Sequence, residues 1–254
     1  MSELSDYQNK YETMKFERRE NVLQVTVHSN GGPLQWGFGP HREWPMAFYD
    51  IANDHENKAI IFTGTGDQFS GPRVTSTTPN LFSKRPSMDF VDRLISEGRQ
   101  TLMNFLNIEV PVISAINGPA WRHSEIPLLA DIVLAADTAM FQDSAHFTGG
   151  LVPGDGMHVV YPLLLGVNRA RYFLLTGQTL DARRAYDLGL VAEVLPPQEL
   201  MDRAWTLAKS IAKQPRSLVR QSRAVLTEQI KVYAQQYLTF GLYAEMLALV
   251  DRPE

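Results

Sequence analysis

The sequence feature that most constrains the fold is a short apolar run, Val110–Ile116, which ends in a sharp Asn-Gly-Pro turn at residues 117–119. The run is long enough for one buried strand and too short for a helix, so it predicts a strand inside a sheet. His123, His146 and Asp155 follow, each close to turn-forming residues. In layered α/β folds, ligands bind where buried strands end and side chains converge on a cleft. We therefore expect the functional region within residues 117–155.

The composition is that of a globular chain that needs no disulfide bonds to be stable. With 254 residues, 44% of them hydrophobic, it is able to bury a full core, and one compact domain with appendages is expected. The absence of cysteine excludes disulfides, a thiolate nucleophile and Cys-based zinc or iron–sulfur sites. The N-terminus is polar, and no apolar run approaches the roughly 18 residues that span a bilayer. A soluble, cytoplasmic protein without a membrane partner is expected.

The charge distribution argues against nucleic acid as a partner. The net charge is −4, and basic residues are scattered among acidic ones. The exception is a modest cluster of Arg216, Arg220 and Arg223 on a helical pattern. A nucleic-acid-binding surface needs a larger basic patch.

The order of the predicted elements is typical of a parallel α/β sheet. Residues 11–28 alternate apolar and polar side chains on either side of residues 19–21, which predicts an antiparallel hairpin. A strand over Ala59–Thr63, a long helix that begins at Ser87 and the strand Val110–Ile116 come next. A strand–helix–strand order of this length predicts parallel pairing with a right-handed crossover.

The chain becomes helical after Asp155, and we expect two parts. Residues 1–195 form the predicted α/β core, and residues 196–254 form a C-terminal helical region. That region contains three predicted helical segments: 198–213, 215–229 and 232–250. Glu245 lies on a mainly apolar stretch of the last segment. It is either an ordinary glutamate on the solvent face or a carboxylate with a function.

A glycine- and proline-rich loop, Ser29–Arg42, holds Trp36, Phe38 and His41. Aromatic side chains in such a loop either fold over the core or line a pocket, and this stretch alone leaves both readings open. His28, His55 and His158 are interpreted as structural residues.

Four sequence runs together resemble the crotonase, or enoyl-CoA hydratase/isomerase, superfamily. They are IIFTGTGDQFSG (60–71), VPVISAINGPAW (110–121), GLVPGDG (150–156) and LLLGVNRARYFLLTGQTLDARRAYDLGLVAEVLP (163–196). The resemblance covers nearly the whole chain. It implies an α/β fold that is a spiral of ββα units in two stacked sheets, with C-terminal helices that form a homotrimer, often a hexamer as a dimer of trimers. It also implies an oxyanion hole, with backbone N–H groups from Gly71 and His123.

The chain departs from the pattern of that superfamily at the positions that correspond to its oxyanion loops and catalytic glutamates. Pro72 stands in the first oxyanion loop and supplies no N–H. Arg122, His123 and Ser124 replace the usual run of glycines. The two glutamates that serve as acid and base in a hydratase fall at Ile126 and His146. Hydration of an enoyl thioester is therefore disfavoured.

These departures resemble 6-oxocamphor hydrolase and the related β-diketone hydrolases, which act on free diketones. The matching runs include LQW at Trp36, HSEIP from His123, FQD followed by HF near His146, and VPGDG at Asp155. The resemblance implies that His123, His146, Asp155 and Glu245 are catalytic and that Trp36 and His41 bind substrate. The expected pocket also includes the aromatic residues Phe38, Phe82, Trp121 and Phe147.

The implied reaction is a retro-Claisen cleavage, which needs no cofactor or metal. Water adds to one carbonyl of a β-diketone, and the C–C bond breaks to release an enolate. A neutral histidine beside a carboxylate is suited to deprotonate water near neutral pH. One hypothesis pairs His146 with Asp155 as that base, and has His123 and Trp36 donate hydrogen bonds to the substrate. The other pairs Asp155 with His123.

Alternative roles for these residues, and alternative functions for the chain, remain open. Glu245 is expected to fix a histidine tautomer or to order the water, while Asp155 is also a normal residue for a Pro-Gly-Asp-Gly turn. Histidines and carboxylates are adequate metal ligands, but no pair stands at helical or strand spacing, so no metal is predicted. Two other functions are kept as alternatives: an acyl-CoA hydratase or isomerase, and a catalytically inactive crotonase-like scaffold.

Overall fold

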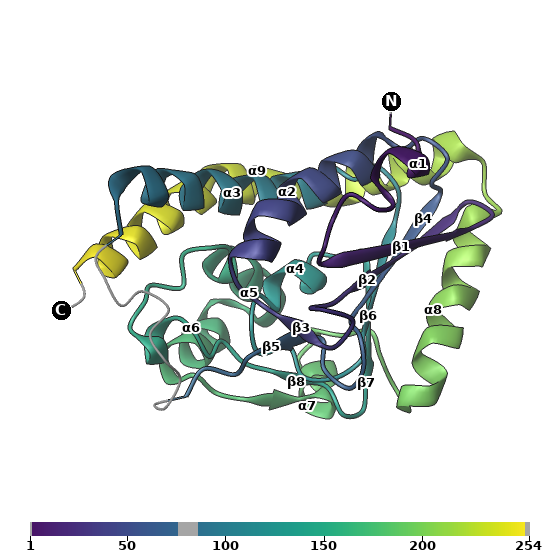
Figure 1. Cartoon of the computed structure of the whole chain (residues 1–254). Helices are drawn as coiled ribbons and strands as arrows, with labels where there is room; N and C mark the ends of the chain where they lie inside the picture. Colours follow the sequence, from purple (N-terminus) through teal and green to yellow (C-terminus); the bar gives the residue numbers. More distant parts are fainter. Residues whose placement is uncertain (1, 76–85, 252–254) are drawn as a thin grey trace.

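The computed structural model describes residues 2–75 and 86–251. Its main sheet has six strands in the order β1-β2-β4-β6-β7-β10 (Figure 1). The strands are β1 (Met14–Arg19), β2 (Val22–Val27), β4 (Ala59–Thr63), β6 (Val112–Ile116), β7 (Ile132–Ala136) and β10 (Glu193–Leu195). β1 pairs antiparallel with β2, and the other neighbours are parallel. The predicted hairpin and the predicted parallel pairing around the strand after residue 110 are confirmed.

A second, smaller layer of strands is assembled from short pieces. β3 (Leu34–Gln35) pairs with β5 (Ser70–Gly71), and β8 (Met140–Phe141) pairs with β9 (Leu180–Asp181). Ala120 forms single bridges to Ser70 and to Phe141, and so joins the two pairs. The expected arrangement of the α/β core in two sheets is therefore confirmed.

The helices cover both faces of the main sheet (Figure 1). They are α1 (Leu4–Tyr7), α2 (Phe38–Asn53), α3 (Met88–Leu106), α4 (Glu125–Leu128), α5 (Met157–Leu165), α6 (Val167–Thr176), α7 (Ala182–Asp187), α8 (Pro197–Ala212) and α9 (Arg216–Val250), with a 3-10 turn at Phe147–Gly149. Successive side chains of a strand point to opposite faces. Accordingly, Ile60 and Phe62 of β4 join the large apolar core with α2 and α3, while Ile61 packs with Leu200 and Ala204 of α8.

The C-terminal region differs from the prediction. The expected helices 215–229 and 232–250 are one continuous helix, α9, of 35 residues. No glycine or proline lies between the two predicted segments, so nothing in the backbone ends the first one. Buried residues along α9, including Ala234, Leu238 and Leu242, belong to the same apolar cluster as the core of the main sheet. The division into 1–195 and 196–254 stays a prediction.

Within the described ranges, none of the helices has both the length and the apolar character that a bilayer crossing requires.

Candidate active site

Asp155 is at the centre of a buried cluster of titratable side chains. It lies in the loop that leads into α5 and is 5% exposed. Its Oδ2 atom is 3.1 Å from Nδ1 of His123 and 3.2 Å from Nε2 of His146. The two pairings that the sequence left open are therefore both present in the geometry, since one carboxylate oxygen contacts both rings.

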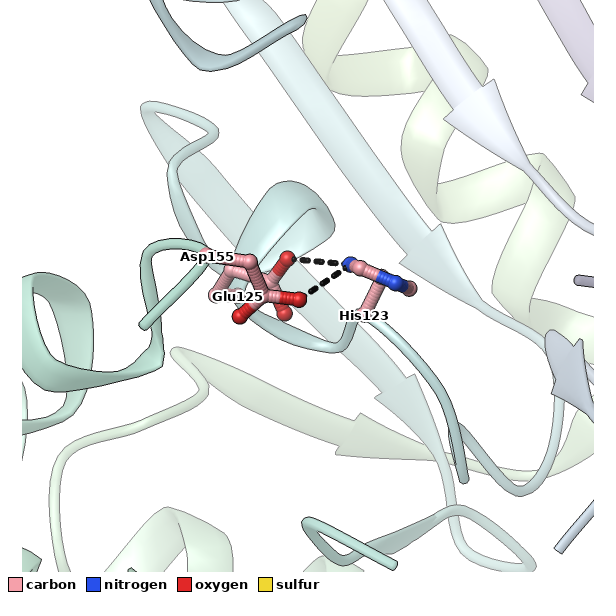
Figure 2. Close-up of side chains that lie close together, drawn as sticks. All are labelled: His123, Glu125 and Asp155. Atoms are coloured by element: carbon pink, nitrogen blue, oxygen red, sulfur yellow. Dashed lines mark hydrogen bonds and ion pairs between the residues drawn. The ribbon is translucent and has the colours of Figure 1, made fainter. Parts of the chain in front are cut away.

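His123 lies between β6 and α4 and approaches two carboxyl groups. Its Nδ1 atom is also 2.9 Å from Oε1 of Glu125, the first residue of α4 (Figure 2). Its backbone has a φ of +49°, in the left-handed region that non-glycine residues rarely adopt. A side chain is therefore carried here on a backbone that suits glycine.

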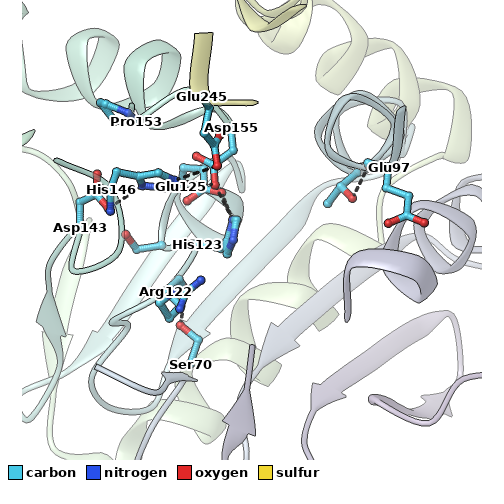
Figure 3. A network of polar contacts seen from close by, with 12 residues as sticks. Ser70, Glu97, Arg122, His123, Glu125, Asp143, His146, Pro153, Asp155 and Glu245 are labelled. Carbon is cyan, nitrogen blue, oxygen red and sulfur yellow. Dashed lines mark hydrogen bonds and ion pairs between the residues drawn. The ribbon is translucent and has the colours of Figure 1, made fainter. Parts of the chain in front are cut away.

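His146 is held through both ring nitrogens. Nδ1 is 2.7 Å from Oδ1 of Asp143, while Nε2, besides its contact with Asp155, is 3.7 Å from Oε1 of Glu245 (Figure 3). Glu245 comes from α9, almost a hundred residues further along the chain. The reading of Glu245 as a glutamate on the solvent face is wrong, because it is buried and lies beside His146.

A close contact between two backbones brings α9 to this cluster. A Cβ atom added to Gly154 would lie 2.0 Å from the carbonyl oxygen of Gly241 in α9. A Cβ atom added to Gly241 would lie 2.1 Å from the ring of His158. The ring nitrogens of His158 contact the carbonyl oxygens of Pro153 and Tyr237 at 3.0 and 3.1 Å. His158 therefore joins the Asp155 loop to α9.

The two histidines of the cluster carry different charge. Burial lowers the pKa of His123 to about 3, and Asp155 offsets only part of this effect. Burial also opposes a charge on His146, but Asp155 and Asp143 outweigh it and hold the pKa of His146 well above its usual value. Burial on its own would raise the pKa of Asp155, but His146 and His123 outweigh it and hold that pKa below its usual range. At neutral pH His123 is neutral, His146 is an imidazolium and Asp155 is ionised.

The two glutamates of the cluster are held toward the neutral form. Burial, followed by the charge of Asp155, raises the pKa of Glu245 to about 7. The same two causes raise the pKa of Glu125 well above its usual value. A site with four carboxyl groups thus avoids four negative charges in one buried volume.

A pocket of about 730 Å³, part of it open to solvent, lies against the cluster. Its lining is mainly apolar, with polar groups on one wall: Trp36, Gly37, Phe38, His41, Leu94, Arg122, His123, Ala145, His146, Leu151, Asp155, Leu242, Glu245, Met246 and Leu249. The indole N–H of Trp36 and Nδ1 of His41 are buried, and neither has a hydrogen-bond partner among the described residues. The ring centroid of Trp36 is 3.9 Å from that of His123. An apolar cavity with a few convergent polar groups is the usual form of a small-molecule site.

Six of the predicted site residues, Trp36, His41, His123, His146, Asp155 and Glu245, meet at this pocket, and so does Phe38. Trp121 and Phe147 are not among its lining residues, and their role in binding substrate stays a prediction. The guanidinium carbon of Arg73 lies 4.7 Å from the ring centroid of Trp121, and Phe147 is 53% exposed on the 3-10 turn. Gly71, the expected source of one oxyanion N–H, is not part of the lining either. Phe82 lies outside the described residues.

Sequence reasoning missed three residues of the site: Arg122, Glu125 and Asp143. Asp143 stands three residues before His146, and Glu125 stands two residues after His123. These spacings permit local contact, so a search for carboxylates within three residues of each histidine would have found both.

The donor atoms of the cluster form two groups that resemble cation sites. His123, Glu125 and Asp155 make one, and His146, Asp155 and Glu245 make the other, with all ligand atoms of a group within 4.8 Å of one another. The prediction that no histidine–carboxylate pair stands at helical or strand spacing is wrong for His123 and Glu125, which are two residues apart and in contact. The fold brings Asp155 and Glu245 to the groups from farther along the chain. Each group mixes imidazole and carboxylate ligands, as zinc sites do.

Comparison with known proteins gives two kinds of relative. The family model described as enoyl-CoA hydratase/isomerase matches residues 41–247. A probable enoyl-CoA hydratase of Mycobacterium bovis is 25% identical and covers 96% of this chain and 93% of its own length. Carnitinyl-CoA dehydratase of Citrobacter koseri is 29% identical over 79% of this chain and 74% of its own length.

A solved structure adds a relative with another activity. It is a β-diketone hydrolase from the cyanobacterium Anabaena sp. PCC 7120 with (S)-3-oxocyclohexyl acetic acid bound, and it is 42% identical to this chain. The match covers 97% of both chains with a TM-score of 0.89. The family model, the fold and these relatives agree: the chain belongs to the enoyl-CoA hydratase/isomerase family of the crotonase superfamily.

Proposed function

We propose that this protein is a hydrolase that cleaves a C–C bond of a β-diketone, cyclic or bicyclic, to give a keto acid. The observation that carries the proposal is the position of Asp155 between a neutral and a charged histidine at the wall of an apolar pocket. The likeness to the β-diketone hydrolase from Anabaena, whose bound ligand is a cyclic keto acid, supports the same substrate class.

The charge states favour His123 as the base that activates water. A histidine that acts as a general base must be neutral and must have an open lone pair. His123 is neutral at pH 7, its Nδ1–H faces Asp155 and Glu125, and no hydrogen bond or ion pair between described residues involves its Nε2. His146 is less suited, because both of its ring nitrogens face carboxylates and the ring is already protonated. This proposal selects the second of the two pairings that the sequence left open.

Trp36 and His146 then stabilise negative charge on oxygen in different ways. The free indole N–H of Trp36 donates to a substrate carbonyl, while His146, whose two ring nitrogens face Asp143 and Asp155, contributes the positive charge of its imidazolium to the pocket. A preorganised donor such as Trp36 lowers a barrier by about 3 to 4 kcal/mol.

The proton balance closes with the same residues. Nε2 of His123 takes a proton from water as the water oxygen bonds to a carbonyl carbon. The C–C bond then breaks and its electron pair moves into the enolate. The enolate carbon takes the proton back from His123, and the product is a keto acid.

The test is turnover of a panel of cyclic 1,3-diketones, followed by loss of diketone absorbance at neutral pH, with a chelator present and with added divalent metal in parallel. We expect wild-type protein to form a keto acid in the presence of the chelator and His123→Ala protein to form none. Hydration of an enoyl-CoA without diketone cleavage would support the acyl-CoA alternative. No reaction with either class would support the inactive scaffold.

A homotrimer or a hexamer remains our proposal for the assembly, supported by large apolar side chains on the outer face of α9. They include Val225, Leu226, Phe240 and Leu247, which are between 72% and 78% exposed. The cytoplasmic location and the lack of membrane, nucleic-acid, cofactor and metal requirements also stay predictions.

A further inference from the structure

Arg122 lines the pocket but has no role in the proposed steps of diketone cleavage. Its backbone carbonyl accepts a hydrogen bond from Oγ of Ser70 at 2.5 Å, and its side chain lines the same cavity as His123 (Figure 3). Neighbouring side chains of an extended chain point to opposite sides. The left-handed φ of His123 breaks this alternation, so that both consecutive residues face the pocket.

The guanidinium of Arg122 has no partner within the described part of the chain. Its Nε is buried without a hydrogen-bond acceptor, and the side chain forms no ion pair. Two other arginines differ: buried Arg223 contacts Asp131 at 2.7 Å and the carbonyl of Leu106 at 3.0 Å, and half-buried Arg18 contacts Asp54 at 2.7 Å. A cation that is mostly out of water without a contact partner is costly, which indicates a ligand that supplies the missing acceptor.

The charges around Arg122 show which kind of ligand fits. Burial lowers its pKa, and the nearby carboxyl groups of Asp155 and Asp143 only partly offset this effect. Both of those carboxylates are in contact with His146 and are thereby compensated. Arg122 is therefore a cation of the pocket whose donors are open.

The proposed reaction creates a new negative charge in this pocket. A neutral diketone becomes a keto carboxylate, in a pocket that already contains ionised Asp155. A planar guanidinium matches a carboxylate with two parallel hydrogen bonds. Building on the proposed function, we propose that Arg122 binds the carboxylate of the keto acid product through its open guanidinium donors.

The test is a comparison of two ligands in binding experiments that need no turnover. One ligand is 3-oxocyclohexyl acetic acid, and the other is the matched neutral ketone with an ethyl group in place of the acetic acid arm. The proteins are wild type, Arg122→Gln, Arg122→Met and Arg122→Lys. Arg99→Gln, which removes an exposed arginine of α3 outside the pocket, is the matched control for loss of one positive charge.

We expect Arg122→Gln and Arg122→Met to bind the keto acid about 10- to 100-fold more weakly, because a charged hydrogen-bonded pair is lost. Binding of the neutral ketone should change less than about twofold, Arg122→Lys should recover part of the keto acid affinity, and Arg99→Gln should bind both ligands as wild type does. Circular dichroism checks the fold, and the Met variant decides if the Gln variant is misfolded, because methionine keeps a long, unbranched apolar side chain at this position.

Unchanged keto acid binding in both charge-free variants would overturn the proposal, as would an equal loss of both ligands or failure of wild type to bind the keto acid. Failure of the proposed function has a different signature. In that case wild type binds the keto acid in an Arg122-dependent way but cleaves no diketone, and the assignment of Arg122 as a carboxylate-binding residue stands without the reaction.

Discussion

A single oxygen atom of Asp155 contacts two imidazoles whose charges differ, and the candidate chemistry depends on this difference. His123 faces Asp155 and Glu125 through one nitrogen only, so burial dominates and the ring is neutral. His146 faces carboxylates through both nitrogens, and their charge outweighs burial. Two copies of one residue type thus acquire opposite protonation states from their neighbours, as is typical of acid and base pairs in enzymes.

The first prediction at the residue scale concerns Asp155→Asn. The amide is nearly the same size but neither fixes the tautomer of His123 nor supports the charge of His146. By analogy with carboxylate-to-amide changes in histidine dyads, kcat for diketone cleavage should fall about a thousandfold or more. Asp137→Asn, an exposed aspartate away from the pocket, is the control. A kcat for Asp155→Asn within tenfold of wild type would contradict the assignment.

The second prediction concerns Glu245 and pH. Its pKa is about 7 in the folded protein and about 4.5 when unfolded, so the folded state retains the proton over that interval. Wild type should therefore lose stability as pH rises from 5 to 8, because ionising the buried carboxyl costs free energy. Glu245→Gln removes this pH dependence of the stability.

Urea unfolding at one fixed protein concentration measures this contribution of Glu245 to the free energy of unfolding. The stability of Glu245→Gln relative to wild type should increase by about 2 kcal/mol between pH 5 and pH 8. Titratable groups that both proteins share contribute equally to the two free energies of unfolding, so their contributions cancel in the difference. A difference that is constant across the range would show that Glu245 titrates normally.

At the scale of elements, the site depends on how closely α9 approaches the loop before α5. Gly154 and Gly241 allow the two backbones to touch, and Glu245 lies one helical turn beyond Gly241. The long helix that covers the sheet therefore also delivers a carboxyl group to the pocket.

The third prediction follows from that contact. Gly241→Ala places a methyl group in a helix, which normally stabilises a protein by about 1 kcal/mol. Here the added Cβ would lie 2.1 Å from the ring of His158 and 2.5 Å from the carbonyl oxygen of Gly154. We expect the variant to be destabilised and to lose kcat, because α9 must move away from Asp155.

Gly98→Ala in α3 is the matched control, measured by thermal unfolding and by kcat in parallel. Its added Cβ would meet only the flexible end of Leu242, at 2.9 Å, so the cost should be small. Equal behaviour of the two variants would show that the approach of α9 does not matter.

What the sequence predicts depends on whether the determinants are local. The hairpin, the strand before the Asn-Gly-Pro turn and the two histidines were predictable because turn residues and apolar runs mark them. The contact of a histidine with Glu245 was expected only from the family resemblance; no local pattern marks His146 as the partner, because the contact depends on the unbroken path of α9. The contact of Trp121 with Arg73, which lies far away in the chain, has no local signal in the sequence either.

At the scale of the whole molecule, α9 has one face in the core and an apolar face outside. Leu218, Val225, Leu226 and Phe240 are each more than half exposed. Such an extended apolar surface is unusual for a monomer and is typical of an interface. A second copy of the chain is the partner that the family resemblance suggests.

The fourth prediction is a trimer or a hexamer in solution. Size-exclusion chromatography with light scattering should give about 86 kDa or about 172 kDa, which is three or six times the chain mass of 28.6 kDa. Val225→Glu with Leu226→Glu should lower this mass, because two charges enter the apolar face. A wild-type mass of one chain would contradict the prediction.

The proposed reaction adds water across a C–C bond of a diketone. To test it, wild-type protein is incubated with a cyclic 1,3-diketone in water labelled with heavy oxygen, and the product is analysed by mass spectrometry. We expect a ring-opened keto acid with one heavy oxygen in its carboxylate, and no such product with His123→Ala protein. Recovery of the diketone unchanged, or of a product hydrated at a C=C bond, would contradict it.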